Sequence, residues 1–152
     1  MRLALTRLKM FFPKLNNQAY SELDFWRICR EQKIIVKELP LKVDGYYEFY
    51  KGKHYILINS ELKGLARLKC LMHELCHRFL HQAYIENKKH FVMYRNAKFL
   101  NNRADKEADA IAVILICPLP MLKKMLTEDL SDHKSLFEII EQRKKVLLEY
   151  GI

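Results

Sequence analysis

Glycine, proline and long apolar runs are scarce in this sequence. Its 152 residues include four glycines and four prolines, too few for a collagen-like or low-complexity chain. The longest uncharged apolar run, residues 110–122, contains two prolines and is much shorter than the about 20 apolar residues of a membrane-spanning helix. Arg2, Arg7 and Lys9 surround only a short apolar run, which does not fit a secretory signal. These absences predict a soluble globular protein with no membrane partner.

Cysteine pairs with the spacing of a zinc knuckle are also missing. The four cysteines, Cys29, Cys70, Cys76 and Cys117, form no C-x-x-C pair. Each has apolar neighbours in the sequence, and free cysteine behaves as a small hydrophobic residue. Stable disulfides are rare in the cytoplasm. We therefore expect four reduced, buried thiols and a cytoplasmic protein.

The composition that is present is typical of one folded domain. Hydrophobic residues make up 50% of the chain and charged residues 30%, which argues against disorder. The length fits a single domain over residues 1–152, and no repeat or linker divides it. Lysine and arginine (27) exceed aspartate and glutamate (18), giving a net charge of +9. This charge favours acidic partners or nucleic acid without requiring either, and no nucleic-acid-binding motif accompanies it.

The apolar pattern predicts an α+β domain. Helices are expected over residues 23–31, 60–81, 104–117 and 131–150, and strands over residues 33–39, 46–50 and 53–59. Ser21 fits the start of the first helix, which would bury Trp26, and Ser60 fits the start of the second. The last two strands are separated by a Lys-Gly turn typical of a hairpin, so we expect a small antiparallel sheet of about three strands. Residues 82–102 lack clear periodicity and are predicted to form mostly loop.

The motif His73-Glu74-Leu75-Cys76-His77 reads H-E-x-x-H and lies on a predicted helix. Residues four apart on a helix share one face, so both imidazoles can bind one ion from the same side. Glu74 is poorly placed as a third ligand, but it can accept a proton from water beside the metal. The motif therefore predicts a Zn²⁺ site at His73 and His77, with Glu74 as the general base of a peptide hydrolase.

A catalytic zinc needs a third protein ligand. On a straight helix His81 lies about 12 Å along the axis from His73, too far to share the ion. The later helix offers Asp105 as the first candidate. Glu107 is its competitor, because it is longer and a bent helix start could redirect it, and a residue elsewhere remains an alternative. Asp109 shares a helix face with Asp105 and could accept the outward N–H of an imidazole as an orienting partner.

Four segments of the chain resemble the ImmA/IrrE family of zinc metallopeptidases. They are residues 45–47, Ile56-Leu57-Ile58-Asn59, residues 72–81 around the H-E-x-x-H motif, and residues 106–112 ahead of Ile116-Cys117-Pro118. Family members usually read H-E-L-G-H, followed by E-x-E-A-(N/D)-x-(F/I)-A and an L-x-P ending. The pairing of H-E-x-x-H with the later carboxylate–alanine helix and its proline is much more specific than H-E-x-x-H alone.

The resemblance implies a zincin-like endopeptidase domain, with a small sheet beside the active-site helix and an acidic ligand from the later helix. It also implies a protein substrate, since similar proteins cleave transcriptional repressors. Here the expected repressor is a separate, co-encoded chain. Two residues depart from the family pattern. Cys76 replaces the usual glycine, and Asp105 stands where the family typically has glutamate, so it must reach with one methylene less.

Two other functions fit the sequence. A catalytically weak, zinc-containing regulatory binding protein is suggested by the Asp105 departure, and a DNA-associated metalloprotease or toxin by the charge. The sequence also offers four side chains that could stabilise the oxyanion of a tetrahedral intermediate: His81, His90, Tyr84 and Tyr94. His54 and His133 are expected at the surface. The oligomeric state is not predicted.

Overall fold

A computed structural model of the chain describes residues 6, 8–81, 85, 87–94, 103–128 and 133–152. In chain order the elements are α2 (Glu22–Glu31), β1 (Ile34–Leu39), β2 (Gly45–Tyr50), β3 (Lys53–Asn59), α3 (Gly64–Leu80), β4 (His90–Tyr94), α5 (Arg103–Ile116), α6 (Leu119–Met125) and α7 (Lys134–Tyr150). The predicted α+β class is confirmed, and the H-E-x-x-H motif lies on α3.

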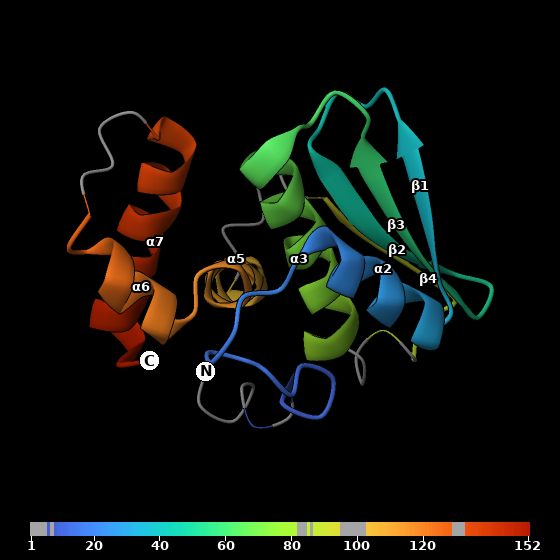
Figure 1. Ribbon diagram of the computed structural model, residues 1–152. Helices are drawn as coiled ribbons and strands as arrows, with labels where there is room; N and C mark the ends of the chain where they lie inside the picture. The colour runs from blue at the N-terminus through green and yellow to red at the C-terminus, as the bar shows by residue number, and fades with distance from the viewer. Residues whose placement is uncertain (1–5, 7, 82–84, 86, 95–102, 129–132) are drawn as a thin grey trace.

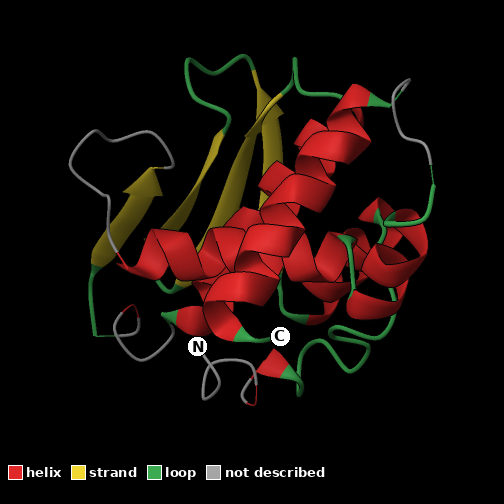
Figure 2. Cartoon of the chain, turned by 90° about the vertical axis from the view of Figure 1, so that its left-hand side faces the viewer, coloured by secondary structure: helices red, strands yellow, loops and turns green. Residues whose placement is uncertain are grey.

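The helices stack in layers on one face of the sheet (Figure 1). α3 lies against β2 and β3, and α2 covers β1 and the flank of α3. α5 packs on the side of α3 that faces away from the sheet, and α7 packs on α5. Figure 2 shows the same division, with the strands in one layer and the helices gathered on one side of it. The H-E-x-x-H helix is therefore enclosed between the sheet and α5.

The sheet differs from the predicted three-stranded antiparallel arrangement. It has four strands in the order β1-β3-β2-β4, and β1 runs parallel to β3. The predicted hairpin of β2 and β3 is present. β3 also pairs with β1, so it lies between the two strands that precede it in the chain. Alternating hydrophobicity predicts which segments are strands, but the order of the strands depends on contacts between distant residues.

The fourth strand, β4, lies in the segment that was predicted to form loop. Its partner is β2, with Phe91 opposite Phe49 and Met93 opposite Tyr47. Tyr47, Phe49 and Met93 are buried on the face that packs against the helices. The apolar run of Phe91, Val92 and Met93 was the available signal, and it is too short to stand out from its polar surroundings.

The start of α2 follows its predicted chemistry. Ser21 and Asp24 form a reciprocal capping box, with Ser21 N donating to Asp24 Oδ2 at 3.0 Å and Asp24 N donating to Ser21 Oγ at 3.3 Å. The predicted burial of Trp26 is wrong. Its side chain is 37% exposed, and its indole N–H donates to Glu22 one turn earlier. The buried face of α2 is formed by Phe25, Ile28 and Cys29 instead.

α3 begins four residues later than predicted. Ser60 does not cap it, because the backbone N–H of Ser60 donates to Leu39 O at 2.9 Å and closes the end of the sheet. The N-cap is Lys63, and no side chain caps the helix. Gly64 follows with a φ of 55°, in the left-handed region that glycine adopts without strain. Residues 60–63 thus form the turn from β3 into the helix.

The interior is a continuous core that joins the sheet to the helices. All four cysteines are free and buried, as predicted, and burial raises the pKa of Cys29 to about 12. Among the described residues, no helix combines the length and apolar character needed to cross a membrane.

Arg143 on α7 is the largest of the fully buried side chains in the described part of the protein, and it joins three segments of the chain. Its Nε donates to Cys117 O at 2.8 Å, its Nη1 to Ile152 O at 2.6 Å and its Nη2 to Asn16 Oδ1 at 2.9 Å. Asn16 Oδ1 also accepts the backbone N–H of Leu119 at 3.0 Å. These bonds hold the N-terminal segment against the end of α5 and the start of α6.

We expect Arg143→Met to destabilise the protein by about 3 kcal/mol, because it leaves buried carbonyl groups without donors. Urea denaturation followed by circular dichroism measures the change. The matched control is Lys123→Met on the exposed side of α6, which should stay within about 0.5 kcal/mol of the parent. Equal stability of the two variants would contradict the fastening role.

Candidate metal centre

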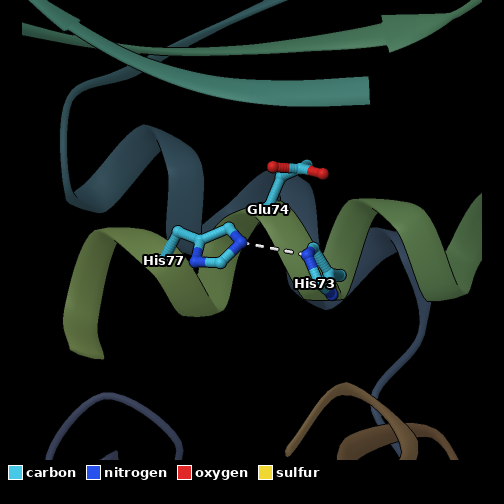
Figure 3. A group of neighbouring side chains, drawn as sticks. All are labelled: His73, Glu74 and His77. Atoms are coloured by element: carbon cyan, nitrogen blue, oxygen red, sulfur yellow. Dashed lines mark hydrogen bonds between the residues drawn. The ribbon is translucent and has the colours of Figure 1, made fainter. Parts of the chain in front are cut away.

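The two histidines of the motif occupy one face of α3. His73 and His77 are completely buried, and their ring centroids lie 4.6 Å apart at an interplanar angle of 85°. Figure 3 shows both imidazoles on the same side of the helix, one turn apart. This is the arrangement that the i, i+4 spacing predicts.

Asp105 from the first turn of α5 completes a compact group of three potential ligand atoms. His73 Nε2 and His77 Nε2 are 2.9 Å apart, and Asp105 Oδ1 lies 3.2 Å from the first and 3.4 Å from the second. Tetrahedral ligands with Zn–N bonds of about 2.0–2.1 Å are separated by about 3.3 Å from one another. The three atoms therefore have the mutual spacing of ligands to one zinc ion.

The chemistry of these donors also fits a cation. Burial lowers the pKa of His73, but its bonds with the Asp105 and Asp109 carboxylates outweigh that effect and raise the pKa to about 9. At His77 burial dominates and lowers the pKa to about 4, although Asp105 opposes it. Burial acts to raise the pKa of Asp105, yet its contacts with the two imidazoles hold that pKa well below the usual range. The partly buried Asp105 carboxylate thus faces two imidazoles, and this set of one carboxylate and two ring nitrogens suits a divalent cation.

Asp109 lies behind His73, on the side away from the converging atoms. Its Oδ1 is 3.0 Å from His73 Nδ1, the ring nitrogen that is not in the ligand group. A carboxylate in this position fixes the orientation and tautomer of a metal-binding imidazole. Lys69, one turn before His73 on α3, lies 3.7 Å from the same oxygen. One carboxylate oxygen of Asp109 thus contacts both the Lys69 ammonium and the His73 ring.

Glu74 is fully buried on α3, and its carboxylate extends toward the sheet, beside the two imidazoles (Figure 3). One of its oxygens lies within 4.8 Å of a ring nitrogen of each histidine. Two carboxylates therefore approach the imidazoles. Asp105 has the spacing of a ligand, whereas Glu74 lies beside the two imidazoles on the side toward the sheet.

Glu107, the competitor for the third ligand position, does not join this group. It accepts a bond from Arg103 Nε at 3.2 Å along α5. The helix is regular through Asp105 and Glu107, so the bent start that could redirect Glu107 is absent from this part of the chain.

The candidates for oxyanion stabilisation and the remaining histidines lie at different distances from the metal centre. His81 lies beside the centre, with its ring 5.4 Å from that of His77. His90 lies away from it and pairs with Glu48 at 2.7 Å across β4 and β2. Tyr84 and the side chain of Tyr94 lie outside the described residues. The surface prediction holds for His133 but is wrong for His54, which is half-buried with its Nδ1 2.5 Å from the Tyr47 hydroxyl.

Lys69 was missed by the sequence reasoning. Its position four residues before His73 was a usable signal, because it places the amine on the histidine face of α3. The second signal was Asp109. The sequence predicts that this α5 residue lies against the histidine face of α3, where a lysine on that face could reach it.

Fold and centre together define an α+β domain with a potential metal site on an H-E-x-x-H helix. The chain belongs to peptidase family M78, described as the IrrE N-terminal-like domain, whose family model matches residues 29–149. The match covers α3 and α5 together and confirms the resemblance found in the sequence. A search of curated proteins finds no match to this chain.

Proposed function

We propose that the protein is a zinc-dependent endopeptidase. The observation that carries this proposal is the convergence of His73 Nε2, His77 Nε2 and Asp105 Oδ1 at separations of 2.9–3.4 Å. The three residues would hold Zn²⁺ through neutral imidazoles and a carboxylate, leaving a fourth position open. Membership of a peptidase family supports peptide hydrolysis as the reaction.

Each residue of the centre has a separate task in this reaction. When bound, zinc polarises the peptide carbonyl and makes water acidic enough to attack at neutral pH. Glu74 accepts the proton of the attacking water and later donates it to the leaving amine nitrogen. Asp109 holds His73 in the tautomer that directs Nε2 toward the ion, and Lys69 balances the charge of Asp109.

The substrate that we propose is a specific cytoplasmic protein, a transcriptional repressor encoded as a separate chain. This part of the proposal comes from the sequence resemblance to the ImmA/IrrE family.

Metal loading tests the centre directly. Protein purified without chelator should contain about one zinc per chain, and prolonged dialysis against a chelator should remove the zinc and abolish cleavage. Elemental analysis and a cleavage assay on neighbouring-gene repressors measure the two effects. Readdition of Zn²⁺ should restore both. Cleavage at full rate by metal-free protein would contradict the proposal.

One alternative is a zinc-containing regulatory binding protein that cuts poorly. The shorter Asp105, in place of the glutamate that the resemblance leads one to expect, favours it. Stoichiometric zinc without cleavage of any tested repressor, but with tight binding to one, would support this alternative. The other alternative is a DNA-associated metalloprotease or toxin, and the net charge of +9 supports it. A DNA affinity that falls steeply as the salt concentration rises would distinguish this alternative from the other two functions.

A further inference from the structure

A groove between α5 and α7 lies next to the metal centre but is separate from it. Its volume is about 360 Å³, within the range of small-molecule pockets. The α5 side consists of Lys106, Asp109, Ala110 and Val113, which follow helical spacing and form one face. α7 contributes the other wall, which includes Lys145 and Glu149, and Lys69 of α3 also lines the groove.

Positive charge gathers in this groove from three helices. Lys106 of α5 and Lys145 of α7 both line it, and neither has an acidic group within salt-bridge distance in the described part of the chain. Lys69 donates to Gln142 Oε1 at 2.7 Å. Asp109 also lines the groove, but its carboxylate is already engaged by His73 and Lys69. Glu149 of α7, an exposed carboxylate, lines the groove as well. The lining therefore holds three lysines and two carboxylates, which leaves one positive charge in excess.

The groove also has an apolar lining. Val113 of α5 lies on one wall, and Val146 and Tyr150 of α7 lie on the other. Val146 is buried, and Tyr150 is half-buried at the side of the core. A purely inorganic ion would leave this apolar surface in contact with water, whereas a ligand with an apolar part would cover it.

We propose that this groove binds a small organic anion. A carboxylate or phosphate group lies between Lys106 and Lys145, and the apolar part of the ligand packs against Val113, Val146 and Tyr150. Two lysines from different helices suit a compact anionic group, to which each ammonium acts as a point charge with rotatable donors. Binding of the anion joins α5 to α7 more firmly.

The groove is connected to the metal centre through Asp109. Asp109 Oδ1 lies 3.0 Å from His73 Nδ1 and 3.7 Å from Lys69 Nζ. An anion in the groove attracts the ammonium of Lys69 and weakens its contact with Asp109. The carboxylate then accepts the His73 N–H more strongly, and the ligand alters the environment of a proposed zinc ligand without touching it.

The binding test uses the full chain in metal-free form, so that coordination of the probe to zinc cannot contribute. Phenyl phosphate, inorganic phosphate and benzoate are titrated separately by isothermal calorimetry at about 0.1 M salt, where exposed charges are largely screened. We expect one site per chain and phenyl phosphate to bind about tenfold more tightly than inorganic phosphate, because its ring covers apolar surface. Comparison with benzoate distinguishes a phosphate ligand from a carboxylate ligand.

Paired variants locate the site. The double variant Lys106→Gln/Lys145→Gln should lower the affinity for phenyl phosphate at least about tenfold. Its control, Lys123→Gln/Lys124→Gln on α6, removes the same charge from outside the groove and should bind like the parent. Equal losses in the two variants, or several weak sites with no preference for phenyl phosphate, would overturn the proposal.

Nuclear magnetic resonance tests the connection to His73 at constant pH. Phenyl phosphate should shift the His73 imidazole resonances in the parent, and Asp109→Asn should remove most of that shift while binding persists. An unchanged His73 signal at saturation would overturn the connection. Neither measurement depends on zinc or on peptidase activity, so a failure of the proposed function would leave both results interpretable.

Discussion

Glu74→Gln should lower the rate of substrate cleavage by about 10²–10⁴, the usual contribution of a general base. Glutamine has nearly the same shape as glutamate but cannot accept the proton of the attacking water. His73, His77 and Asp105 remain in place, so the zinc content should stay at about one per chain. The variant should therefore keep its metal and lose its activity.

Glu61→Gln is the matched control for this experiment. Glu61 is exposed in the turn before α3, and the substitution removes one negative charge at a distance from the imidazoles. Single-turnover cleavage rates, zinc content and thermal unfolding should be measured on both variants. If Glu74→Gln cleaved the natural substrate as fast as Glu61→Gln, Glu74 could not be the base.

The pair of imidazoles could be predicted from the sequence because it depends only on local geometry. Once residues 73–77 are helical, the i, i+4 spacing alone places His73 and His77 together. The same reasoning grouped Asp105 with Asp109, and the structure brings both to His73. Their roles as ligand and orienting partner stay predictions.

Features that depend on distant segments could not be predicted. The parallel pairing of β1 with β3 joins residues about twenty positions apart across an intervening strand. β4 is a strand because β2 offers it a free edge, although its own pattern is weak. The groove beside Asp109 exists only because α7 packs on α5, and neither helix alone indicates that Lys106 and Lys145 would line the same groove.

Asp105→Ala should lower the affinity for zinc by more than about 100-fold. It removes one of three proposed ligands, whereas loss of an outer partner typically costs 10–100-fold. Asp109→Asn should fall in that intermediate range. Glu107→Gln should bind zinc like the parent, because its carboxylate pairs with Arg103 one turn away on α5. Competition titration with a chromophoric chelator measures all three, and circular dichroism checks that each variant is folded.

The order of the three affinities decides which carboxylate holds the ion. The distances require a definite order of zinc affinity. Asp105→Ala should bind zinc most weakly, Asp109→Asn should be intermediate, and Glu107→Gln should bind zinc like the parent. If Glu107→Gln weakened binding more than Asp105→Ala, the assignment of Asp105 would be wrong. In that case α5 would have to rotate when zinc binds.

The variant Asp105→Glu tests whether α5 is positioned for the shorter side chain of aspartate. The added methylene moves the carboxylate by about 1.5 Å, while Asp105 Oδ1 already lies 3.2 and 3.4 Å from the two Nε2 atoms. Ala108 and Ala112 are completely buried, so α5 has little room to withdraw from its neighbours. We expect Asp105→Glu to bind zinc more weakly than the parent but more tightly than Asp105→Ala. A zinc affinity equal to or above that of the parent would show that the packing of α5 is not matched to aspartate at this position. The shorter side chain would then be a change that the centre tolerates, not one that the position of α5 requires.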